Sequence, residues 1–201
     1  MANARQTILQ IAQRALSATL EPLEFTPHEA LWIRHTREVT QVVAIQASRF
    51  GTAGRAAVWI EYCPLHGKVQ VRQESTIESL INSENNIVRI RLNEISTEVP
   101  PYYMLTPGTG ANSLEHEIQA DIGRVLRPVL SETTDLNGII TFLADMNDRD
   151  DAERYALPIA VTYARLGMME QGAVYFRRCR GDAEAIRRIA RSYGIDLEDN
   201  P

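Results

Sequence analysis

The segment Leu31–Tyr62 constrains the fold more than any other part of the chain, because it contains two long runs of strand-forming residues. Val39–Phe50 is the central run, and Ala56–Tyr62 follows it after the glycines of Gly51–Gly54. β-Branched and aromatic residues favour strands, and glycines allow a tight turn between them. Apolar residues occupy both sides of the alternation in Val39–Phe50. We therefore predict that this run is a central, covered strand of an antiparallel sheet.

A helix is predicted before this sheet, and another strand after it. Apolar residues recur at helical spacing from Ile8 to Leu20, which predicts an amphipathic N-terminal helix that packs on the sheet. The run Ile87–Asn93 alternates strictly, with Arg89 and Arg91 on the polar side. This alternation predicts a strand with one buried and one solvated face.

The distribution of prolines and glycines divides the chain into regions of a single domain. We expect a helix and sheet over residues 1–99, a connector over 100–112, a helical subdomain over 113–194 and a tail over 195–201. The predicted fold class is α+β. An antiparallel sheet of about four to six strands packs against the N-terminal helix and is followed by a C-terminal helical bundle.

Composition indicates an ordinary globular protein. Hydrophobic residues make up 44% of the chain and charged residues 23%, and its two cysteines are too few for a disulfide framework. The sequence contains no apolar run of membrane-spanning length, and its N-terminus enters an amphipathic pattern without the apolar core of a signal peptide. We expect a cytoplasmic protein that does not associate with membranes.

Five short motifs follow one another along the chain, and their order is more specific than any one of them. They are a hydrophobic-Gln-x-Ser strand, an arginine-rich strand, an aromatic pair, a proline-containing helix end and a Leu-Gly hairpin: Val43–Ser48, Val88–Leu92, Tyr102–Tyr103, Leu126–Leu130 and Ala164–Gly167. This order resembles the bacterial domain of unknown function 4304 family, over roughly Gln6 to Arg178. The resemblance implies a fold, but this family has no established activity that could be carried over.

Motifs that would bring a metal or a cofactor are incomplete. The acidic run Asp145–Glu153 fails the calcium-loop pattern, because its fifth position is Arg149. Cys63–His66 has the spacing of half a zinc site, and no second closely spaced pair accompanies it. Pro107–Gly110 lacks the lysine of a phosphate-binding loop. We therefore predict no metal, no cofactor and no catalytic residue.

Charge is distributed unevenly along the second half of the chain. Residues 101–153 contain ten acidic residues against three arginines, and residues 154–191 contain eight arginines against three acidic residues. An acidic surface speeds the capture of a basic partner. We predict a partner-facing acidic group at Asp145, Asp148, Asp150 and Asp151. The arginines are predicted to form a solvated face or to pair with the acidic helices.

A second candidate surface lies on the sheet. Arginine and tyrosine are enriched at binding surfaces. On this basis we predict a binding group at Arg34, Gln46, Arg89, Arg91, Tyr102 and Tyr103. The same pattern also fits an ordinary solvated sheet face.

The leading functional hypothesis is a non-catalytic module that binds another protein, such as an immunity-type protein that masks a toxin. One alternative is a small hydrolase of a phosphorylated or nucleotide substrate. In it, Arg89 and Arg91 would hold the anion, and Glu61 or an acidic residue of the helical half would act as the base. A further alternative is nucleic-acid binding through the C-terminal arginines. The sequence does not predict an oligomeric state.

Overall fold

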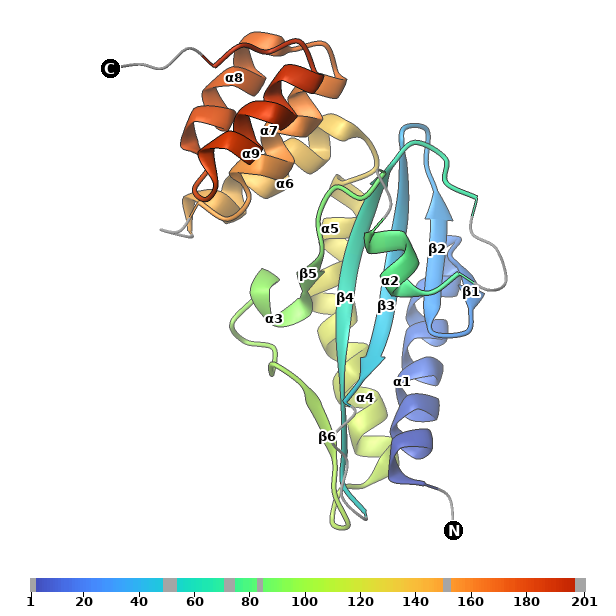
Figure 1. The fold of residues 1–201 in the computed structure, drawn as a ribbon. Coiled ribbons are helices and arrows are strands. Elements are labelled where there is room, and N and C mark those ends of the chain that lie inside the picture. The colour runs from blue at the N-terminus through green and yellow to red at the C-terminus, as the bar shows by residue number, and fades with distance from the viewer. Residues whose placement is uncertain (1–2, 49–53, 71–74, 83–84, 150–152, 198–201) are drawn as a thin grey trace. The chain divides into compact units, whose positions relative to one another are not determined.

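The protein combines one antiparallel sheet with helices, which confirms the predicted α+β class. The computed structural model describes residues 3–48, 54–70, 75–82, 85–149 and 153–197 (Figure 1). The chain divides into two compact units, Met1–Ser131 and Glu132–Pro201. The two units are described separately below. No helix among the described residues is both long and apolar enough to cross a membrane.

The first unit is built on a six-stranded antiparallel sheet. Its strand order is β1-β2-β3-β4-β5, and β6 also pairs with β4. The strands are β1 (Thr26–His28), β2 (Leu31–His35), β3 (Val39–Ala47), β4 (Ala56–His66), β5 (Ile90–Arg91) and β6 (Tyr103–Leu105). The central position predicted for the strand that begins at Val39 is confirmed, because β3 lies between β2 and β4 and is buried from Val39 to Ile45.

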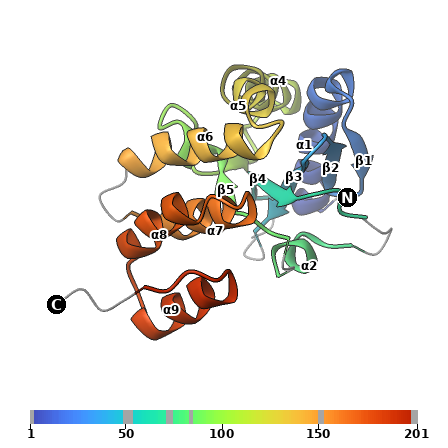
Figure 2. The same ribbon diagram turned by 90° about the horizontal axis from the view of Figure 1, so that it is seen from above.

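Helices cover one face of this sheet, and a short helix lies on the other. Figures 1 and 2 show α1, α4 and α5 on one face, which we call the α1 face, and α2 on the opposite face, the α2 face. The helices of this unit are α1 (Ala4–Leu20), α2 (Ile77–Ile81), α3 (Leu92–Ile95), α4 (Ala111–Asp121) and α5 (Arg127–Glu132).

Helix α1 forms because its apolar residues share one stripe. Asn3 caps its first turn by accepting a hydrogen bond from the Arg5 N–H. The stripe, which includes Ile8, Ile11 and Leu16, is fully buried. Most of the stability of this helix therefore comes from packing and not from the intrinsic propensity of its residues.

Helices α4 and α5 are joined by a π-helical segment, Ile122–Leu126, in which the Arg127 N–H donates to the carbonyl of Ile122. Pro128 follows immediately. Proline has no N–H and its ring crowds the carbonyl four residues earlier, so a regular α-helical ladder cannot pass through this point. The wider turn lets the chain continue to Glu132 without a break.

The strand predicted over Ile87–Asn93 is much shorter, and the physical cause is a β-bulge. The register runs from Leu65↔Asn86 to Tyr62↔Ile90, so the three residues of 87–89 lie opposite the two residues of 63–64. The ladder is interrupted there, and the helical turn of α3 begins at Leu92. The regular alternation predicted for Ile87–Asn93 is therefore broken at residues 87–89.

The connector predicted over 100–112 also contains regular structure. β6 pairs with the start of β4 through Ala56↔Leu105 and Val58↔Tyr103. Two residues of this strand are buried by the pairing although prolines and glycines surround them. Helix α4, which was expected in the helical subdomain, packs on α1 in the first unit.

The second unit contains α6 (Leu136–Asp148), α7 (Ala156–Arg165), α8 (Met169–Arg178) and α9 (Ala183–Ser192). Helices α7 and α9 end in the same way, each with a glycine of positive φ, Gly167 and Gly194. After each glycine, the next N–H closes a six-residue turn: Met168 donates to the Tyr163 carbonyl and Ile195 to the Ala190 carbonyl. This arrangement satisfies the last carbonyls of both helices.

We predict that Gly138→Ala destabilises the second unit strongly. A Cβ atom at this position would lie 1.9 Å from the backbone carbonyl oxygen of Glu132, which cannot move away as a side chain can. The free energy of unfolding should fall by about 3 kcal/mol. Thermal melting followed by circular dichroism measures the change.

Gly123→Ala provides the control, because a Cβ there would meet no atom within 4 Å apart from its chain neighbours and the backbone of its own helix. Alanine in a helical position should change stability by less than about 1 kcal/mol. Equal effects of the two substitutions would contradict the packing argument.

Candidate functional site

The candidate site lies on the part of the α2 face that α2 leaves open. Under α2, the sheet residues Leu31, Ile33 and Cys63 form an apolar cluster with Ile77 and Leu80. Beyond this cluster the same face continues along β4 with Glu61 and Trp59, because side chains two residues apart point to the same side of a strand. The first residue of β4 beyond the apolar cluster on this face is therefore Glu61, a carboxylate, and not another apolar residue.

Glu61 is completely buried, and nitrogen donors surround its carboxylate. Arg89 donates from both Nε and Nη2, each at 2.7 Å, one to each carboxylate oxygen. The indole N–H of Trp59 donates to Oε1 at 2.8 Å. A buried carboxylate is tolerated only when it is paired and hydrogen-bonded in this way. Arg91 pairs with Glu61 across β4 and β5, and Arg89 lies two residues before Arg91, so strand alternation places Arg89 on the face of Glu61.

Arg91 completes the group but is held less tightly. Its Nε lies 3.7 Å from Glu61 Oε1, its side chain is 51% exposed, and its guanidinium lies over the Trp59 ring at 5.1 Å. Burial lowers the pKa of the Arg89 guanidinium, but its hydrogen bond to Glu61 and the charge of Glu61 more than offset this and leave the pKa raised. Arg89 is therefore a cation, and Trp59 is fixed between Glu61 and Arg91.

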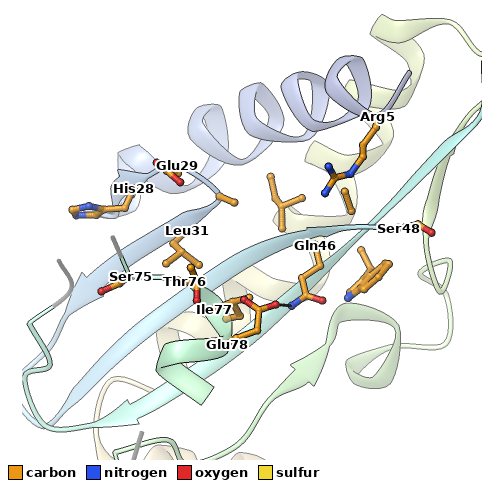
Figure 3. Close-up of a pocket in the computed structure, with 14 residues that line it drawn as sticks. Arg5, His28, Glu29, Leu31, Gln46, Ser48, Ser75, Thr76, Ile77 and Glu78 are labelled. Carbon is orange, nitrogen blue, oxygen red and sulfur yellow. Dashed lines mark hydrogen bonds between the residues drawn. The ribbon is translucent and has the colours of Figure 1, made fainter. Parts of the chain in front are cut away.

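A groove adjoins Trp59 (Figure 3). It has a volume of about 500 Å³, a size typical of specific ligand sites. Trp59 and Ile77 line it together with the polar side chains of Gln46 and Glu78, which approach each other at 3.4 Å. Figure 3 shows Arg5 of α1 near the end of the groove marked by Ser48, and His28 and Glu29 at the opposite end.

Of the binding group predicted on the sheet, the structure brings together Gln46, Arg89 and Arg91. Gln46 is paired with Trp59 across β3 and β4, and Arg91 with Glu61 across β4 and β5, so all of these side chains share the α2 face. Met104 of β6 is paired with Ala57, which lies on the α2 face, so Met104 lies on this face too. Tyr102, which is 47% exposed, directly precedes β6.

Arg34 and Tyr103 do not belong to this group, because strand alternation places them on the α1 face. Arg34 donates to Gln41 at 2.8 Å and to the carbonyls of Leu23 and Leu130 at 3.2 and 2.7 Å. Burial lowers its pKa, although Tyr62 and Glu24 act in the opposite direction. Its cation stabilises the end of α5, where helix carbonyls lack partners.

Tyr103 is buried and donates its hydroxyl to Asp121 at 2.9 Å. Burial, followed by the charge of Asp121, raises the pKa of the Tyr103 phenol well above its ordinary value. Asp121 also pairs with Arg124 at 2.9 Å. These contacts fasten β6 to α4, so Tyr103 and Asp121 stabilise the fold.

Only two of the four residues of the predicted acidic group, Asp145 and Asp148, lie within the described residues. Asp145 and Asp148 are exposed near the end of α6, and Asp148 lies 3.8 Å from Arg178. Asp150 and Asp151 lie outside the described residues. No group of three or more metal-ligating side chains occurs in the part of the chain that the structure describes.

Sequence reasoning missed the role of Trp59 as the residue shared by the Glu61 network and the groove. The alternation of β4 places Trp59 and Glu61 on one face, and this could have indicated their contact. The pairing of β5 with β4, which brings Arg89 and Arg91 to Glu61, leaves no comparable signal in the sequence.

The fold and site together define an α+β protein whose single antiparallel sheet carries an arginine- and tryptophan-lined surface on its partly open face. A family model described as a domain of unknown function (DUF4304) matches residues 16–132, more than half of the chain. The chain belongs to this family. No curated protein and no solved structure matches it.

The matched region ends at Glu132, the last residue of α5 and one residue beyond the end of the first unit at Ser131. The match is therefore shorter than the range Gln6–Arg178 expected from the sequence motifs. The Leu-Gly motif Ala164–Gly167 lies outside it, in the second unit.

We predict that Glu61→Gln destabilises the first unit. The amide offers only one acceptor oxygen to two guanidinium donors and leaves Arg89 without a counter-charge. Because the Arg89 side chain is 33% exposed, the free energy of unfolding should fall by about 2–3 kcal/mol, less than for a fully buried pair. Urea unfolding measures this change.

Glu117→Gln on the exposed surface of α4 is the matched control and should change stability by less than about 0.5 kcal/mol. A Glu61→Gln protein as stable as the control would show that the network contributes little.

The two cysteines should differ in reactivity. Burial, followed by the charge of Glu61, raises the pKa of the Cys63 thiol well above its ordinary value. Burial and the charge of Glu153 raise the pKa of Cys179 to about 11. Since only the thiolate reacts, Cys179 should react slowly at pH 7 and faster as the pH approaches 11.

Titration of the Cys179→Ser variant with a chromogenic disulfide isolates Cys63, which should react only after unfolding. Rapid reaction of Cys63 in the folded variant would be inconsistent with the burial of this strand.

Proposed function

We propose that this protein is a non-catalytic module that binds another protein through the Trp59 face, which we define as Trp59, Arg91, Met104 and the adjoining Tyr102. One observation carries the proposal. The buried carboxylate of Glu61 is engaged by Arg89 and Trp59, and it holds the Trp59 ring and the half-exposed Arg91 above that ring in a fixed position. A rigid aromatic residue beside an arginine loses little conformational entropy on binding.

The composition of the Trp59 face supports the same proposal. Tyr102 and Met104 are among the few large hydrophobic side chains exposed in the described residues, at 47% and 41%. Aromatic residues, methionine and arginine are enriched at the centres of protein interfaces. A partner that covered Met104 and Tyr102 would also reach the edge of Trp59.

The contacts of Glu61 favour binding over the hydrolase alternative. In that alternative Arg89 would clamp an anionic substrate, and Glu61 would accept a proton from it. Here Arg89 is the bidentate partner of Glu61, and Glu61 has no exposed surface. A general base must be within reach of the proton that it abstracts.

The narrower hypothesis of an immunity-type protein adds a basic toxin as the partner. It draws on the exposed carboxylates of Asp145 and Asp148 in the second unit. A toxin-domain gene beside the gene for this protein would support it. Nucleic-acid binding by the C-terminal arginines remains an alternative, and strongly salt-dependent affinity would be its signature.

Affinity purification from the native host tests the proposed function. Met104→Glu places a charge on the Trp59 face at an exposed site and should reduce recovery of a stoichiometric partner at least about tenfold, the effect of roughly 1.4 kcal/mol. Val174→Glu, at the 52% exposed Val174 of the second unit, is the matched control and should retain the partner.

Recovery of no stoichiometric partner by the unmodified protein would count against a protein-binding function. Equal recovery by both variants would instead place the contact away from the Trp59 face.

A further inference from the structure

The central strand β3 extends beyond its neighbour β2. β3 pairs with β4 over its whole length, from Val39↔His66 to Ala47↔Val58. Its pairing with β2 ends at Leu31↔Ala44, after which one further bond joins the Ile45 N–H to the Ala30 carbonyl. The chain turns away at this point, because His28↔Leu31 closes the β1–β2 hairpin.

The backbone of Ala47 faces the side that β2 has left. Successive residues of a strand point their N–H and C=O groups to opposite edges. Ile45 donates toward β2 and Ser48 donates to Ala57 of β4, so the N–H and C=O of Ala47 point toward the β2 side. Within the described part of the chain, no strand pairs with β3 on this side beyond Ala30.

The groove lies along this open edge and includes side chains from both faces of the sheet. On the α1 face it is lined by Arg5, Ile45 and Ala47, and on the α2 face by Gln46 and Trp59 (Figure 3). A pocket above one face of a sheet would be lined from that face alone. This groove has the shape expected where a neighbouring strand is missing.

We propose that an extended segment of the partner protein binds in this groove as an additional strand, paired with β3 at Ala47 in the position that β2 vacates. This inference rests on the proposed function and specifies how the partner is held. Unpaired groups at a sheet edge are a template for another chain, and main-chain hydrogen bonds supply affinity in such complexes.

The side chains around the groove define the chemistry of the segment. Arg5 on the α1 face is exposed, and no ion pair is formed by its guanidinium within the described residues, so it favours an acidic residue there. On the α2 face, Trp59, Leu31 and Ile77 favour an apolar residue, and Glu78 disfavours an acidic one. The segment should therefore alternate apolar and acidic residues.

Ala47→Pro tests the inference in the whole protein. Proline removes an N–H for which the described residues provide no acceptor, and it places its ring in the groove. This variant should therefore fold, as prolines on open strand edges do. The probe is a library of displayed random heptapeptides selected on the unmodified protein. Selected peptides should alternate apolar and acidic residues, and they should bind Ala47→Pro at least about tenfold more weakly by fluorescence anisotropy.

A scan of N-methyl groups along a selected peptide keeps the test independent of the stability of the variant. Methylation should weaken binding about five- to tenfold at alternate positions only, because every second amide of an added strand faces β3. Amide hydrogen exchange of Ala47 should slow when the peptide is bound.

Failure of strand addition can be separated from failure of the proposed function. A library that gives no binder, or a peptide insensitive to both Ala47→Pro and alternate N-methylation, would overturn the added strand. A native partner whose recovery falls with Met104→Glu but is unchanged by Ala47→Pro would also overturn it, while the protein-binding function would stand.

Discussion

The continuous pairing of β3 with β4 is the constraint on which the rest of the first unit depends. It joins nine residue pairs and buries both faces of β3, one against α1 and its neighbours and the other under α2. Helix α1 needs this surface to cover its apolar stripe, and among the described residues β5 and β6 pair only with β4. Because β2 is shorter than β3, the same pairing leaves the end of the central strand at an open edge.

Glu61 shows how a polar group can be part of such a core and still influence the surface. Its carboxylate would be costly to bury alone, so Arg89 and Trp59 are drawn to it. The network therefore does two things. It satisfies a buried charge, and it fixes an aromatic ring and Arg91 at the boundary between the covered and open parts of the α2 face.

Much of the fold could be predicted from periodicity, but the site could be predicted only in part. The alternation around Val39 and the helical spacing from Ile8 predict elements because each pattern is local. Arg34 and Gln46 were predicted to lie together, and strand alternation places them on opposite faces. Arg89 was predicted to lie on a solvated face, but it donates to the buried carboxylate of Glu61. The sequence does not show which strands pair, so it could not identify this contact.

The sequence by itself determined the α+β class, the central place of the strand that begins at Val39, the N-terminal helix and the family. These follow from patterns of neighbouring residues and from motif order. Only the tertiary structure decided that β6 forms within a proline-rich stretch, that α4 packs with the first unit, and that Glu61, Arg89 and Trp59 meet. Each of these depends on pairing between residues distant in the sequence, whose energy comes from partners that no local pattern identifies.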